Sequence, residues 1–95
     1  MHRDDLEEYE AEAELELYRE YRDVISMFRF VVETDRRFYL ANEVVRISAP
    51  GDAAVEYQLN DCWVWDVYRR SRFLRSVTLV GAKAIAVEEL PPSEL

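Results

Sequence analysis

Histidine, cysteine and glycine are scarce in this 95-residue chain, which contains one histidine, one cysteine and two glycines. His2 stands at the terminus, so neither a Ser-His-Asp triad nor a histidine acid–base pair is available. A zinc site needs about three or four Cys or His ligands, and a phosphate-cradling loop needs more glycine. Without a histidine partner, Cys62 is expected to be a small structural residue. We therefore expect no enzyme activity, no metal and no cofactor.

Other absences bear on location. A single cysteine excludes an intrachain disulfide, which favours a reducing compartment. No apolar run approaches the roughly 20 residues of a membrane span. The acidic N-terminus, which lacks an apolar segment, does not fit a secretory signal. We expect a cytoplasmic protein with no membrane partner.

Negative charge is present in excess but is confined to one end of the chain. Residues 1–16 carry eight acidic side chains against one basic one, a net charge of −7. The remaining 79 residues carry 12 acidic and 11 basic side chains, a net charge of −1. A body of nearly neutral charge can still carry basic patches, so the acidic total does not exclude a polyanionic partner.

Residues 4–26 are predicted to form one long helix, since apolar side chains recur at spacings of three and four and carboxylates crowd the first turns. The apolar stripe consists of Leu6, Tyr9, Ala13, Leu17, Tyr21, Val24 and Phe28. Acidic residues are expected on the opposite side of the helix, namely Glu12, Glu16, Glu20 and Asp23. Such a stripe must pack on another element.

Residues 27–90 are rich in aromatic and β-branched side chains and predict an antiparallel sheet of four or five strands. Turns are expected at 34–36 and at 49–53, and a change of alternation predicts a bend or bulge near 41–44. Residues 76–90 predict either a hairpin or one long bent strand, and 91–95 a solvated tail. The whole chain, 1–95, is thus expected to be a single α+β domain in which the N-terminal helix packs on a curved sheet.

The stretch "WVWDVYRRSRFLR", residues 63–75, is the candidate functional segment. It contains four arginines and one acidic residue, Asp66, which gives a net charge of +3 in an acidic protein. Guanidinium groups beside aromatic rings bind phosphates or carboxylates and stack on bases. The candidate partner-binding residues are Arg69, Arg70, Arg72, Arg75, Trp63, Trp65, Tyr68 and Phe73, with Arg36 and Arg37 as neighbours. In the competing interpretation the tryptophans close the core and the acidic helix neutralises the arginines.

The motifs "EAELELYREYRDVISMFRFVVETDRRFYLANEV", "DCWVWDVYRRSRFL" and "AVEEL" cover most of the chain. In these motifs the chain resembles a small actinobacterial family, the domain of unknown function 2469. The resemblance implies an actinobacterial cytosolic protein without an assigned activity, whose gene commonly lies near that of an RNA–DNA hybrid nuclease. It implies no catalytic or binding residue.

Two hypotheses of function follow. The first is a non-enzymatic interaction module in which segment 63–75 binds an anionic partner, either nucleic acid or an acidic protein. The alternative is a self-associating structural scaffold, a homodimer in which the aromatic stripe of one copy meets the other. A small-ligand pocket between helix and sheet is a third candidate, and an enzyme is the last.

Overall fold

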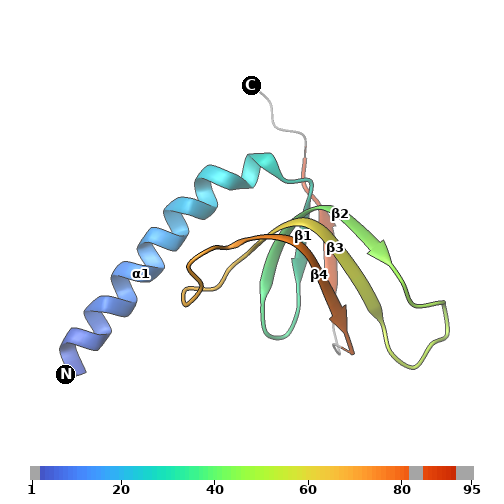
Figure 1. Ribbon diagram of the computed structural model, residues 1–95, viewed down its shortest axis with the longest axis horizontal. Coiled ribbons are helices and arrows are strands. Elements are labelled where there is room, and N and C mark those ends of the chain that lie inside the picture. Colours follow the sequence, from blue (N-terminus) through green and yellow to red (C-terminus); the bar gives the residue numbers. More distant parts are fainter. Residues whose placement is uncertain (1–2, 82–84, 92–95) are drawn as a thin grey trace.

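The computed structural model describes residues 3–81 and 85–91, in which one long helix is followed by an antiparallel sheet (Figure 1). Helix α1 (Arg3–Val24) ends in a short 3₁₀ turn, η1 (Ile25–Met27). The strands are β1 (Phe30–Glu33), β2 (Phe38–Arg46), β3 (Glu56–Val64), β4 (Phe73–Val80) and β5 (Ala86–Glu89). Their order in the sheet is β4-β3-β2-β1-β5. The predicted α+β class is confirmed, with five strands in the described residues, whereas most of the predicted tail, 92–95, lies outside them.

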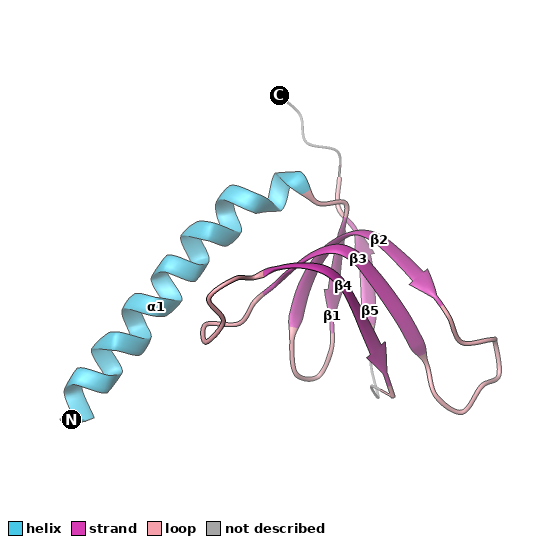
Figure 2. Cartoon of the chain, viewed as in Figure 1, coloured by secondary structure: helices cyan, strands magenta, loops and turns pink. Residues whose placement is uncertain are grey.

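Helix α1 covers one face of the sheet with its C-terminal half. Leu17, Val24 and Phe28 are buried there against Leu40 of β2 and Trp63 of β3. Figures 1 and 2 show the N-terminal half of the helix running past the sheet into open space. The apolar stripe predicted from the sequence is therefore longer than the surface available to bury it.

The opposite face of the sheet holds a second core. Its buried members come from β1, β2 and β3: Val32, Tyr39, Ala41, Leu59, Cys62 and Val64. Leu79 of β4 and Ile85 beside β5 also pack against it, although these strands are the two edges of the sheet. The β1–β2 turn and the end of β4 line a common hollow of about 320 Å³. The sheet therefore curls around this second core, and strands form its walls.

The curl is produced by a line of bends across three neighbouring strands. Ala41 and Val44 of β2 both contact the second core, although residues three apart in a regular strand face opposite sides. The same holds for Leu59 and Cys62 of β3. It holds also for Leu74 and Val77 of β4. The bend predicted at 41–44 is thus present, and its continuation into β3 and β4 is a feature that the hydrophobic pattern did not predict.

Asp61 lies at the centre of this line and has a φ of 54°, in the left-handed region. Aspartate enters this region more easily than most residues because its short polar side chain makes local hydrogen bonds. Here the Asp61 carboxylate accepts a 2.6 Å bond from the Asn42 amide, and the Asn60 amide donates a 2.5 Å bond to Glu43. These cross-strand bonds hold β2 and β3 together where their alternation breaks.

The prediction for residues 76–90 was wrong. Residues 76–90 form neither a hairpin nor one bent strand, because β4 pairs with β3 and β5 pairs with β1, at opposite edges of the sheet. Alternating apolar residues mark a strand but do not select its partner. The partner is selected by the curl, which brings Val87 of β5 opposite Val32 of β1.

Substitution of Asp61 tests the left-handed bend. Asp61→Asn keeps both a local hydrogen-bonding side chain and tolerance of positive φ, so the free energy of unfolding should change by less than about 1 kcal/mol. Asp61→Val places a β-branched residue in the same conformation and should cost about 2 kcal/mol. Urea unfolding followed by circular dichroism measures both. Equal costs for the two variants would contradict a backbone role for this residue.

Candidate functional site

An aromatic cluster supports the segment singled out in the sequence. Trp63 is fully buried, and its ring lies 6.0 Å from that of Trp65 in an edge-to-face arrangement. Tyr21 of α1 contacts both tryptophans, at centroid distances of 5.9 and 5.5 Å, and contacts Phe38 at 5.6 Å. These separations are typical of favourable aromatic pairs. The tryptophans thus fix the base of the segment and bind helix to sheet.

Glu20 of α1 joins the helix to the sheet by two hydrogen bonds. Its carboxylate accepts a bond of 2.7 Å from the Trp63 indole N–H and forms an ion pair of 2.8 Å with Arg72. The prediction that Glu20 lies on the side of the helix opposite the apolar stripe was wrong. The spacing in fact places Glu20 on the sheet-facing side of the helix, because it lies three residues after Leu17 and four before Val24, both of which face the sheet.

Residues 65–72 form the loop between β3 and β4, and Asp66 organises it. Its carboxylate accepts the Tyr68 backbone N–H at 3.0 Å and pairs with Arg37 of the β1–β2 turn at 2.7 Å. Its backbone carbonyl accepts a 3.2 Å bond from Arg72. Partial burial alone raises the pKa of Asp66, but the Tyr68 N–H and the Arg37 guanidinium outweigh this and hold the pKa below its ordinary value. Asp66 therefore caps the backbone of the loop and ties the loop to the β1–β2 turn.

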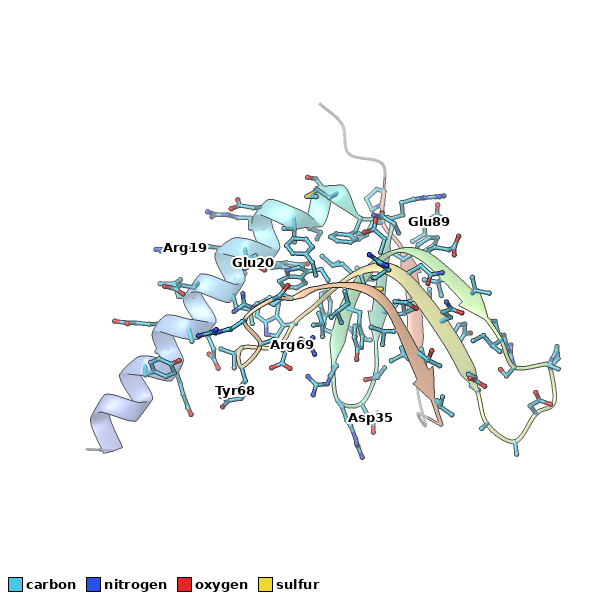
Figure 3. The ribbon with its side chains drawn as sticks, viewed as in Figure 1. Arg19, Glu20, Asp35, Tyr68, Arg69 and Glu89 are labelled. Atoms are coloured by element: carbon cyan, nitrogen blue, oxygen red, sulfur yellow. The ribbon has the colours of Figure 1, made fainter. Side chains whose placement is uncertain are left out.

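The tip of this loop is exposed. Tyr68 is 79% accessible, and Arg69 and Arg70 beside it are also exposed. Figure 3 shows Tyr68 and Arg69 at the end of the loop, between the middle of α1 and the turn that carries Asp35. Arg36 of that turn lines a shallow hollow of about 320 Å³ together with Trp65. We call Arg36, Tyr68, Arg69 and Arg70 the arginine rim.

The remaining predicted site residues lie elsewhere. Arg72 is mostly buried by its contacts with Glu20 and Asp66, and Trp63 lies beneath the surface, so neither is presented to a partner. Trp65 is half-buried under the loop. Phe73 and Arg75 are exposed on strand β4, beyond the loop. Among the described residues, the ion pairs of the arginines in and near the segment are those of Arg37 and Arg72.

Cys62 does not supply a reactive thiol. The residue is buried, and burial with the neighbouring Asp61 charge raises the pKa of the thiol to about 11, so it remains protonated at neutral pH. In the part of the chain that the structure describes, there is no group of three or more His, Cys, Asp or Glu side chains placed to hold a metal ion. Within the same residues, no helix has the length and apolar character needed to cross a membrane. His2 lies outside the described residues.

Comparison with known proteins places this arrangement in a family. Uncharacterized proteins of Mycobacterium tuberculosis and Mycobacterium bovis are 50% identical to this chain over 97 residues, which span all of this chain and 96% of theirs. No solved structure matches the chain. The model of a family described as "Protein of unknown function (DUF2469)" matches residues 1–95. The chain therefore belongs to this family, as the motifs of its helix and of segment 63–75 predict.

Proposed function

We propose that this protein is a non-enzymatic interaction module whose arginine rim binds single-stranded nucleic acid. The observation that carries the proposal is the exposure of Tyr68 beside Arg69 and Arg70, on a loop whose base is fixed by Asp66 and the tryptophans. An exposed aromatic ring offers a stacking platform for a base, and flanking guanidinium groups fit phosphate oxygens.

The distribution of charge supports the same function. The rim belongs to the part of the chain whose net charge is close to zero, while the eight acidic residues between positions 4 and 16 belong to α1. Figure 3 shows Arg69 on the loop, on the side of α1 that faces the sheet. Charges in solution are screened beyond about 8 Å at physiological salt, which limits the effect of the acidic end on the potential at the rim. Binding is expected to be weak and strongly dependent on salt.

Fluorescence anisotropy with a short labelled single-stranded DNA tests the proposal. The double variant Arg69→Ala/Arg70→Ala should raise the dissociation constant about tenfold or more, and the slope of log K against log salt should fall by about 1.4, because two guanidinium groups no longer neutralise phosphates. Tyr68→Ala should weaken binding without changing this slope, since a stacking contact releases no counterions. The matched control is Arg19→Ala/Arg22→Ala, which removes the same charge from exposed positions on α1.

Two outcomes would contradict the proposal. The first is an equal loss of affinity in the control, which would indicate general charge attraction. The second is full competition by polyglutamate together with no effect of Tyr68→Ala. That result would assign the rim to an acidic protein surface, because a carboxylate partner has no base to stack.

A further inference from the structure

The two edges of the sheet differ sharply in how they are protected. Edge strand β5 has four residues, two of which are Glu88 and Glu89, and short charged edges resist pairing with other chains. Edge strand β4 has eight residues and a single charge, Arg75. Within the described residues, β4 pairs with β3 on one side only. A long edge with so little charge is open to pairing by a further strand.

The backbone groups that point outward from β4 follow from its bonds to β3. The Arg72 carbonyl accepts from Val64, and the Gly81 N–H donates to Val55, so both residues point toward β3. Alternation from Arg72 leaves the N–H and C=O groups of Phe73 and Arg75 pointing outward. Alternation back from Gly81 leaves those of Thr78 and Val80 pointing outward. Between Arg75 and Thr78 the alternation of inward-pointing and outward-pointing residues shifts by one position, and this shift is the bend described above.

The same four residues carry side chains that lie on one face. Leu74, Val77 and Leu79 pack on the second core, so their neighbours at 73, 75, 78 and 80 face the other way. Phe73 is 51% exposed and Val80 is 62% exposed, although both are large apolar residues. Each end of this edge therefore offers an uncovered apolar side chain beside unpaired backbone groups.

We propose that β4 pairs antiparallel with β4 of a second copy, with Phe73 opposite the second copy's Val80 and Arg75 opposite its Thr78. This register aligns all the outward-pointing backbone groups, and each copy's exposed phenylalanine covers the other's exposed valine. It also places Leu74 opposite the second copy's Leu79, so residues that face the second core lie beside each other, and so do residues of the other face. Two sheets of five strands become one continuous sheet across a twofold axis.

Other registers of the same pairing are less favourable. Alignment of Arg75 with its own copy in the second chain places two guanidinium groups directly opposite each other, which is repulsive. Shifting by one residue sets an outward-pointing residue opposite one that points toward β3, and the hydrogen bonds cannot form. Shifting by two leaves Phe73 and Val80 apart. The bend therefore determines the register, because the alternation of outward-pointing residues must shift at the same place in both β4 strands.

Thr78→Pro tests the pairing selectively. Proline removes an N–H that points away from β3, so the β3–β4 ladder within one copy is kept while the bond to a second copy is removed. Sedimentation velocity of the full chain over a range of concentrations should show a monomer–dimer equilibrium whose dissociation constant rises about tenfold or more in Thr78→Pro. Thr78→Ala keeps the N–H and should behave as the unchanged protein.

A pair of cysteine substitutions tests the register. The double variant Phe73→Cys/Val80→Cys should form a covalent dimer with a short bifunctional thiol cross-linker, whereas Phe73→Cys alone should not, since position 73 faces position 80 of the other copy. Buried Cys62 does not contribute. The inference is overturned if the unchanged protein is monomeric up to high micromolar concentration. It is also overturned if Thr78→Pro and Thr78→Ala dimerise equally, or if the single cysteine cross-links as well as the double.

Discussion

Leu17→Ala is expected to lower the free energy of unfolding by about 2 to 4 kcal/mol. Leu17 of α1 has no exposed surface, and it packs into the cluster that contains Leu40 and Trp63. Truncation removes apolar contacts and leaves a cavity that the rigid aromatic cluster above Trp63 cannot close by small movements. Urea unfolding followed by tryptophan fluorescence measures the change.

Leu15→Ala is the matched control for this variant. It makes the same chemical change two residues earlier on the same helix, where the side chain is 51% exposed, and should cost less than about 1 kcal/mol. Deletion of residues 1–26 should abolish the cooperative transition, because it removes the cover of one face of the sheet. A truncated chain that unfolds cooperatively near the temperature of the full chain would refute the packing of α1 on the sheet.

The fold could be predicted from the sequence where the information is local. Spacings of three and four predicted the helix, and alternation predicted strands and the bend in β2, since each depends on side chains that are near neighbours in the chain. The pairing of β5 with β1 depends on the curl of the whole sheet, and the curl passes through Asp61, whose positive φ leaves no mark in the hydrophobic pattern.

The site was predictable to a similar extent. The sequence singled out the segment that contains the exposed Tyr68, Arg69 and Arg70 by its density of arginines and aromatic residues, but it predicted no loop there. It could not separate these arginines from Arg72, which pairs with a carboxylate 52 positions away. That separation requires the position of α1 over the sheet, and the spacing of Glu20 from Leu17 and Val24 is the local observation that supplies it.

The second large effect is expected at Glu20. Glu20→Ala should lower the free energy of unfolding by about 2 kcal/mol, since it leaves the indole N–H of buried Trp63 without its acceptor and removes the ion-pair partner of Arg72. A fully buried pair would cost about 3 to 5 kcal/mol, but the Glu20 side chain is 32% exposed and water replaces part of the interaction. Glu20→Gln keeps an acceptor for the indole and loses the ion pair, so its cost should be about half as large.

Glu16→Ala is the control for charge, because it removes an exposed carboxylate from the same helix one turn earlier. Its effect should be no more than about 0.5 kcal/mol. A double variant, Glu20→Ala/Arg72→Ala, measures the coupling of the two partners and should cost less than the sum of the single changes. If Glu20→Ala and Glu16→Ala are equally stable, or if the costs at Glu20 and Arg72 simply add, the two side chains do not interact in solution. Arg72 would then be free to join the arginine rim, and the partner-binding surface would extend to the base of the loop.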